Sequence, residues 1–190
     1  MHIGLYFGSF NPIHLGHLII GNQLAESGLV DEVWFVVSPQ NPDKETSSLL
    51  NDRQRLHMVR LALENAQKMK ASAVEFELPK PSYTINTLMY LEEKYPAHTF
   101  SILLGSDGFQ NLDQWKNAAV LKEKVHFFVY ERPGFPITNN LEKYFTILNT
   151  PFLNISSTYI RKLIQENKSI QYLVPDSVQT YIHANLFYLH

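Results

Sequence analysis

Two histidines stand three residues apart near the start of the chain, in the stretch "FGSFNPIHLGHLII" that runs from Phe7 to Ile20. At positions i and i+3 of a helix, His14 and His17 would share one face of the first turn and could reach the same ligand. Imidazoles donate hydrogen bonds to phosphate oxygens, and the free N–H groups of a helix N-terminus attract an anion. The spacing therefore predicts a phosphate site. A histidine that only caps the helix and a two-histidine metal site are the alternatives, although no thiolate or nearby carboxylate offers a third ligand.

The loop before these histidines has residue types suited to turning the chain near a phosphate. Gly8 allows a tight turn, and Pro12 stiffens the loop. The stretch contains neither G-x-x-x-x-G-K-[ST] nor G-x-G-x-x-G. It is therefore neither a P-loop nor a dinucleotide fingerprint.

Strand-like and helix-like patterns alternate along the chain, and these elements must position the loop. Strands are predicted at 3–7, 32–38, 73–78 ("AVEFEL") and 99–105, with further candidates at 125–130 and 144–149. Helices are predicted at 15–28, 52–66, 84–95, 114–124, 157–167 and 175–187, and residues 39–50 form a candidate mobile loop. The alternation predicts an α/β fold, a Rossmann-like doubly wound parallel sheet with a helical C-terminal segment, in one domain spanning residues 1–190. Ligands of such a sheet bind at the carboxyl ends of its strands.

Composition narrows the class of protein. The absence of cysteine excludes disulfides, thiolate metal sites and cysteine nucleophiles, and makes a reduced cytoplasmic setting the expectation. No signal peptide or bilayer-length apolar run is apparent, so we expect a soluble protein with no membrane partner. A net charge of −2 with a pI near 6.4 argues against a nucleic-acid partner but allows a local phosphate pocket. These features are compatible with a homo-oligomer.

Two motifs resemble those of one enzyme superfamily. "GSFNPIHLGH" resembles the first motif of the nucleotidyltransferases marked by H-x-G-H, and "ISSTYIR" (Ile155 to Arg161) resembles their second motif. Four further stretches, "PSYTINTL", "LLGSDGFQNLDQW", "ERPG" and "TPFLNISST", are similar to the bacterial nicotinate-nucleotide adenylyltransferases, over almost the whole chain. The resemblance implies transfer of the adenylyl group of ATP to nicotinate mononucleotide, which gives nicotinate adenine dinucleotide and pyrophosphate. It also implies Mg²⁺ bridging the substrate phosphates, because the sequence offers no dedicated carboxylate cage.

The same resemblance assigns roles to residues of this chain. Asp107 would accept a hydrogen bond from a ribose hydroxyl, or is only a turn residue. Trp115 would stack on the pyridine ring, or packs in the core. The hydroxyls of Ser157 and Thr158 would hold phosphates, while the stretch "SST" (Ser156 to Thr158) would cap a helix, or would do both. The catalytic residues that the resemblance implies are His14, His17 and Arg161. The implied ATP site comprises these three together with Gly8, Ser9, Phe10, Gly105, Asp107, Ser157 and Thr158. The implied site for the mononucleotide comprises Lys44, Ser82, Tyr83, Thr84 and Trp115.

The chain departs from the family pattern at four positions. Phe7, Ser9 and Asn11 stand where the family usually has glycine, threonine and aspartate, and Asp43 stands where a histidine is common. Ser9 keeps a hydroxyl, and Asn11 keeps a short polar side chain that can hold the turn. The departure at Asp43 leaves a phosphate contact there in doubt.

Several other functions are compatible with parts of this motif pattern. Nicotinamide-mononucleotide and pantetheine-phosphate adenylyltransferases are alternatives within the superfamily, and a non-catalytic nucleotide sensor is an alternative outside catalysis. A fragment of a class I aminoacyl-tRNA synthetase would also carry H-x-G-H, and "KMKAS" (Lys68 to Ser72) superficially resembles its second motif. That motif should follow a completed nucleotide fold, whereas several predicted strands come after Ser72.

Overall fold

The computed structural model describes residues 1–40, 49–137 and 143–189, and these contain a six-stranded sheet. Its order is β3-β2-β1-β4-β5-β6, and every neighbouring pair is parallel. The connections run outward in opposite directions from β1 and β4, so the switch point of the topology lies between them. The strands are β1 (His2–Gly8), β2 (Glu32–Val37), β3 (Met69–Ser72), β4 (Thr99–Gly105), β5 (His126–Tyr130) and β6 (Phe145–Leu148).

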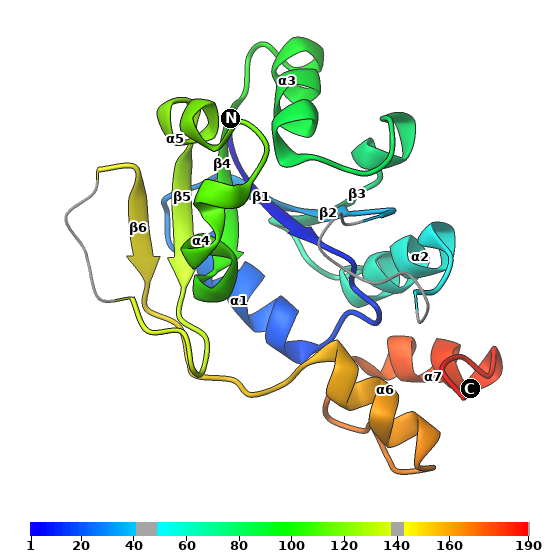
Figure 1. Ribbon diagram of the computed structural model, residues 1–190. Helices are drawn as coiled ribbons and strands as arrows, with labels where there is room; N and C mark the ends of the chain where they lie inside the picture. The colour runs from blue at the N-terminus through cyan, green and yellow to red at the C-terminus, as the bar shows by residue number, and fades with distance from the viewer. Residues whose placement is uncertain (41–48, 138–142, 190) are drawn as a thin grey trace.

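Helices connect the strands and form the C-terminal segment (Figure 1). The α-helices are α1 (Leu15–Ala25), α2 (Asp52–Ala62), α3 (Thr84–Lys94), α4 (Ser106–Gln110), α5 (Ala118–Lys124), α6 (Ser157–Gln165) and α7 (Asp176–Ala184). Two short 3₁₀ turns are η1 (Val74–Glu77) and η2 (Leu112–Gln114).

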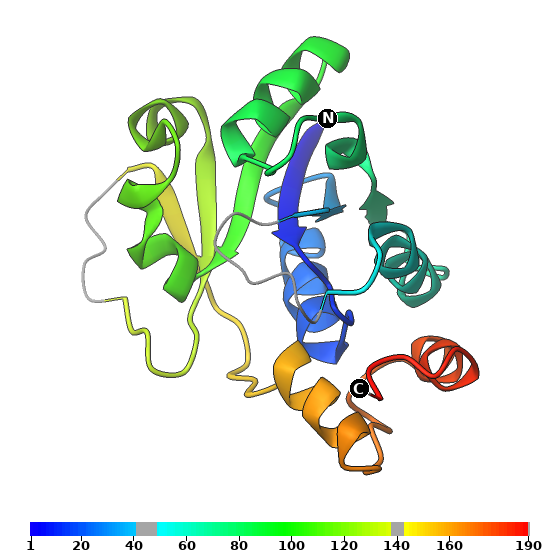
Figure 2. The same cartoon turned by 45° about the vertical axis from the view of Figure 1, so that its right-hand side comes forward.

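Two apolar clusters form because successive side chains of each strand face opposite sides of the sheet. On β1, Leu5 belongs to the cluster that includes α3 and α5, whereas Tyr6 belongs to the cluster that includes α1, α2, α6 and α7. Helices therefore cover both faces, as the predicted Rossmann-like α/β fold requires (Figures 1 and 2). Both views place α6 and α7 at the end of the sheet toward which the arrowheads of β1 and β5 point.

The predicted strand at 73–78 is wrong. Residues 74–77 form η1, and the third strand is the earlier segment Met69–Ser72, which pairs with β2 at the edge of the sheet. The alternation of Val74, Phe76 and Leu78 is typical of a strand, but Glu75 between them is buried rather than exposed. The "KMKAS" stretch thus supplies an edge strand.

Other boundaries also differ from the predicted ones. Helix α1 ends at Ala25 and α2 at Ala62, earlier than the sequence indicates. The predicted helix at 114–124 begins only at Ala118, because Trp115 is extended and Asn117 has a left-handed backbone with φ of 57°. Helix α4, directly after β4, was not predicted. None of the helices within the described residues is long and apolar enough to cross a membrane.

Candidate active site

A cavity of about 1100 Å³ lies at the carboxyl ends of β1 and β4, at the switch point of the sheet. Lys44 is outside the described residues, and every other residue assigned to the site from the sequence lines this cavity. The first motif contributes Gly8, Ser9, Phe10, His14 and His17; the segment after β4 contributes Gly105, Asp107 and Trp115; the start of α3 contributes Ser82, Tyr83 and Thr84; and the start of α6 contributes Ser157, Thr158 and Arg161.

The two histidines form a stacked pair at the start of α1. His14 is the N-cap residue, and the centroids of its ring and of the His17 ring are 3.7 Å apart. The backbone N–H of His14 donates a hydrogen bond to Nδ1 of His17 at 3.3 Å. Because Nδ1 accepts this bond, the proton of the neutral His17 ring belongs on Nε2. His17 can therefore donate from Nε2 to an anion.

His14 occupies a buried environment that favours a neutral ring. Burial, with a smaller contribution from the positive charge of Arg132, lowers the pKa of His14 from 6.5 to about 4. Its Nδ1 atom is buried and has no hydrogen-bond partner among the described residues. Burial thus favours an uncharged His14 ring in this structure, and stacking disfavours a charge on both rings at once.

The second motif is bonded directly to the loop of the first motif. Nη1 of Arg161 donates a hydrogen bond to the backbone carbonyl of Asn11 at 2.9 Å, and Oγ of Ser157 donates to the carbonyl of Pro12 at 2.8 Å. The helix cap is Ser156, whose Oγ accepts from the N–H of Tyr159 at 3.2 Å. The capping role considered for the stretch "SST" is thus confirmed, and its first residue, Ser156, performs it.

The side chain of Asn11 holds the turn through distant partners. Its Oδ1 atom accepts hydrogen bonds from the hydroxyl of Tyr188 at 2.8 Å and from the backbone N–H of Leu50 at 3.3 Å. An amide oxygen can accept both bonds without burying a charge. The departure from aspartate at this position thus fits its surroundings.

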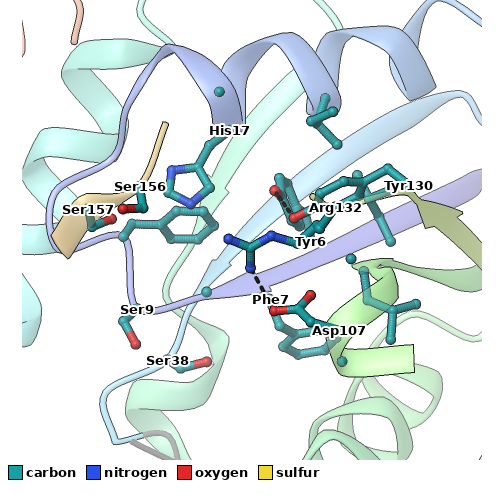
Figure 3. A pocket seen from close by; sticks show the side chains of 18 of the residues that line it. Tyr6, Phe7, Ser9, His17, Ser38, Asp107, Tyr130, Arg132, Ser156 and Ser157 are labelled. Atoms are coloured by element: carbon teal, nitrogen blue, oxygen red, sulfur yellow. Dashed lines mark hydrogen bonds and ion pairs between the residues drawn. The ribbon is translucent and has the colours of Figure 1, made fainter. Parts of the chain in front are cut away.

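Arg132, in "ERPG" after β5, lines the cavity, and no role was predicted for it from the sequence. Its Nη1 atom and Oδ2 of Asp107 form an ion pair at 2.7 Å (Figure 3). The pair leaves no room for a side chain at Gly105, where a Cβ atom would lie 2.7 Å from Cδ of Arg132. The sequence held a signal, since "ERPG" is one of the stretches shared with the family, but nothing in it indicated the partner.

A second arginine with no predicted role lies next to the loop that follows β1. Arg55 of α2 is 0% exposed, and no carboxylate among the described residues forms an ion pair with it. Its guanidinium donates hydrogen bonds to four backbone carbonyls, those of Ser9 at 2.6 Å, Ser38 at 2.8 Å, Pro39 at 3.1 Å and Leu50 at 2.8 Å. Arg55 thus joins the loop after β1 to the segment after β2. In the sequence it is one of several charged residues of an amphipathic helix, which hides this role.

The opposite end of the cavity is formed by the start of α3. Tyr83 is the N-cap residue and makes no side-chain hydrogen bond to the helix, while the buried hydroxyl of Ser82 has no partner among the described residues. Glu75, also part of the lining, accepts a hydrogen bond from the hydroxyl of Thr87 at 2.8 Å. Burial raises the pKa of Glu75, although nearby hydroxyls oppose this.

Comparisons with known proteins agree on a family. The model of the cytidylyltransferase-like family matches residues 5–163. The chain is 48% identical to a protein of Cytophaga hutchinsonii, with 99% of this chain and 98% of that protein covered, and 48% identical to one of Flavobacterium johnsoniae, with 99% of each covered. Both are named as probable nicotinate-nucleotide adenylyltransferases. The solved structure of the Plasmodium falciparum nicotinic acid mononucleotide adenylyltransferase complexed with NaAD shares the fold, with a TM-score of 0.85 at 24% identity over 98% of this chain and 97% of that one.

Proposed function

Because this chain belongs to the cytidylyltransferase-like family, and within it to the nicotinate-nucleotide adenylyltransferases, we propose that it transfers the adenylyl group of ATP to nicotinate mononucleotide. The products are nicotinate adenine dinucleotide and pyrophosphate. Residues 1–190 would act as one nucleotidyltransferase domain, built on the single sheet whose switch point holds the cavity.

One observation supports this function best: two motifs far apart in the sequence meet at one cavity. Ser157 and Pro12 are 145 residues apart, yet the hydroxyl of one donates to the carbonyl of the other. The histidine pair and Arg161 thereby line the same cavity. A site that must hold a triphosphate while one phosphorus reacts requires donors from more than one direction.

The reaction needs no nucleophilic side chain. An oxygen of the mononucleotide phosphate attacks the α-phosphorus of ATP, and a new P–O bond forms. The bond between that phosphorus and the oxygen bridging to the β-phosphorus breaks, so that pyrophosphate leaves with the electron pair. The protein has to bring two anions together in line and stabilise the negative charge on the transferred group.

The geometry suits His17 and Arg161 to different parts of this task. The Nε2–H of His17 would donate to an oxygen of the α-phosphate, beside the free N–H groups of α1. Arg161 would hold the leaving pyrophosphate with the N–H groups that the Asn11 carbonyl leaves available, together with Ser157 and Thr158. Asp107 would orient a ribose hydroxyl while bonded to Arg132, since a carboxylate accepts several hydrogen bonds.

Mg²⁺ would enter with the nucleotide as part of the substrate. Among the described residues, no group of three histidine, aspartate or glutamate side chains could hold a metal ion. The carboxylate of Asp107 is bonded to Arg132, which makes it a poor ligand in this arrangement. Mg²⁺ prefers phosphate and water oxygens, and it would neutralise charge on the phosphates when bound.

Turnover with defined acceptors tests the function. Wild-type protein is mixed with Mg·ATP and with nicotinate mononucleotide, nicotinamide mononucleotide or pantetheine phosphate, and pyrophosphate release and dinucleotide formation are followed. We expect kcat/KM for the acid to exceed that for the amide by roughly two to three decades, because only the acid carries a full charge toward the N–H donors of α3. Equal values for acid and amide would reject the nicotinate assignment, and binding without pyrophosphate release would identify a sensor.

A further inference from the structure

The last part of the chain contacts the loop of the first motif without contributing to the cavity lining. Among the described residues that line the cavity, the last one along the chain is Arg161. The family model ends nearby, at residue 163. Residues 170–189, which include α7, lie beyond both limits. In this structure, any influence of these residues on the reaction therefore passes through a residue of the lining.

Two hydrogen bonds join residues 170–189 to this loop, one at each of its ends. The hydroxyl of Tyr188 donates to Oδ1 of Asn11 at 2.8 Å. The backbone carbonyl of Leu173 accepts a hydrogen bond from the N–H of Leu15 at 2.9 Å. His14 lies between these two attachment points in the sequence, and its ring stacks on that of the second histidine. Residues 170–189 therefore help to place the histidine pair.

Tyr188 is suited to this contact because it is buried and keeps its proton. The residue is 8% exposed, and the centroid of its ring lies 6.3 Å from that of the Phe187 ring. Burial raises the pKa of Tyr188, although the positive charges of Arg161 and Arg55 oppose this. Its backbone has φ of 66°, a left-handed conformation that residues other than glycine rarely adopt. The buried contacts of the side chain therefore offset the cost of this conformation.

The acceptor, Asn11, connects Tyr188 to the groups proposed to bind ATP. Asn11 lines the cavity, and its backbone carbonyl accepts the hydrogen bond from Arg161. Its Oδ1 atom also accepts from the N–H of Leu50, at 3.3 Å, which is long for a bond of this kind. The hydroxyl of Tyr188 thus makes the shorter of these two bonds to the amide oxygen. Without it, the side chain of Asn11 would be held less tightly and the loop could shift.

We propose that Tyr188 is a positioning residue whose hydroxyl, through the side chain of Asn11, keeps the loop of the first motif in the conformation that binds ATP. This inference rests on the proposed function. If only a fraction of the molecules has the loop in this conformation, the apparent affinity for ATP falls in proportion to that fraction. The bound triphosphate would itself restore the loop, so the effect belongs in KM for ATP rather than in kcat.

The test compares the steady-state kinetics of single and double variants. Tyr188→Phe removes only the hydroxyl, Asn11→Ala removes its acceptor, and the double variant shows whether the two groups act as one unit. Tyr181→Phe is the matched control, because the ring of Tyr181 also packs against Phe187, with centroids 5.4 Å apart, and the residue is absent from the cavity lining. Initial rates with Mg·ATP and nicotinate mononucleotide give kcat and both KM values. They are measured at a temperature where circular dichroism shows every variant folded.

We expect Tyr188→Phe to raise KM for ATP about threefold to tenfold, the scale of one neutral hydrogen bond, and to change kcat and KM for nicotinate mononucleotide less than about twofold. Asn11→Ala should raise KM for ATP at least as much, and adding Tyr188→Phe to it should have little further effect. Tyr181→Phe should behave as wild type.

A purely structural contribution of Tyr188 would lower the midpoint of thermal unfolding and the amount of active protein, but it would leave KM for ATP unchanged. That result would overturn the role of Tyr188, and so would increases in KM that multiply fully in the double variant. If wild-type protein releases no pyrophosphate from these substrates, the proposed function itself is wrong, and the inference falls with it.

Discussion

The guanidinium of Arg132 and the carboxylate of Asp107 join the segments that follow β5 and β4, with Nη1 and Oδ2 2.7 Å apart. Both side chains are partly exposed, at 42% and 35%, so solvent screens their attraction. The contact thus contributes little to folding, and it holds a guanidinium and a carboxylate at fixed places in the cavity.

We therefore expect Arg132→Met to lower the activity of the protein while leaving its stability almost unchanged. We expect the free energy of unfolding to change by less than about 1 kcal/mol, because the pair is exposed. kcat/KM for ATP should fall about tenfold or more, because the cavity proposed to bind the triphosphate loses one of its cations. Urea unfolding and initial rates give the two quantities. Lys124→Met, which breaks an exposed ion pair with Glu92 outside the lining, is the control. Unchanged kinetics in Arg132→Met would contradict the expectation.

His17→Ala should act on the chemical step. If Nε2–H of His17 bonds to charge that grows on the α-phosphate, kcat should fall about 100-fold or more, with KM for ATP less affected. Steady-state kinetics with saturating acceptor measure both constants. His183→Ala, an exposed position on α7 outside the cavity, should behave as wild type. A variant at position 17 with normal kcat would remove His17 from the reaction.

The buried environment of His14 predicts a pH dependence of stability. The folded pKa of about 4 lies below the ordinary value of 6.5, so the unfolded chain binds the proton first as the pH falls. Stability is complete above pH 6.5 and is lost as the pH falls toward 4, by about 2 kcal/mol between pH 7 and pH 5. Urea unfolding at both pH values should show a smaller loss in His14→Gln. An NMR titration in which His14 has its midpoint near 6.5 would refute this.

Arg161→Lys tests the forked geometry of the second motif. Lysine keeps the charge but cannot bond the carbonyl of Asn11 and a phosphate with the same planar group. We expect kcat/KM for ATP to fall about tenfold or more. Lys162→Met, an exposed neighbour on α6, provides the comparison. If Arg161→Lys equals wild type, the arginine only stabilises the loop.

Arg55→Met should be costly for folding. The variant leaves four backbone carbonyls around the loop after β1 without their donor, and each buried polar group that loses its partner costs about 1–3 kcal/mol. The midpoint of urea unfolding measures the loss, and Arg53→Met, at a more exposed position of the same helix, should change it little. A midpoint like that of wild type would show that Arg55 is dispensable.

The sequence predicted the sheet, its parallel strands and the start of α1, because long apolar periodicities and a distinctive motif determine them. It misplaced β3, because the buried carboxyl of Glu75 bonds to Thr87, a tertiary contact that no local pattern contains. It also missed α4 and began the helix at 114–124 too early, because the backbone conformation of single residues decides those boundaries.

Cavity-lining residues were predicted where a motif contains them and were missed where a long-range contact defines their place. His14 and His17 follow from their spacing. The partner of Asp107 is 25 residues away, and the four carbonyls bonded to Arg55 belong to two different loops. Local sequence carries no trace of such pairings.

The hydrogen bonds of Asn11 also have a bearing on how the protein is synthesised. Asn11 leaves the ribosome among the first residues, whereas Arg161 and Tyr188, which hold its backbone and side chain, are 150 and 177 residues later. At about 5–20 residues per second, the last of these partners arrives roughly 10–35 s after Asn11. The six strands of the sheet precede Arg161 in the sequence. A nascent chain can therefore assemble its sheet while the loop that contains Asn11 still lacks these two hydrogen bonds. We therefore expect this loop to gain its full set of hydrogen bonds only when the last part of the chain has been made.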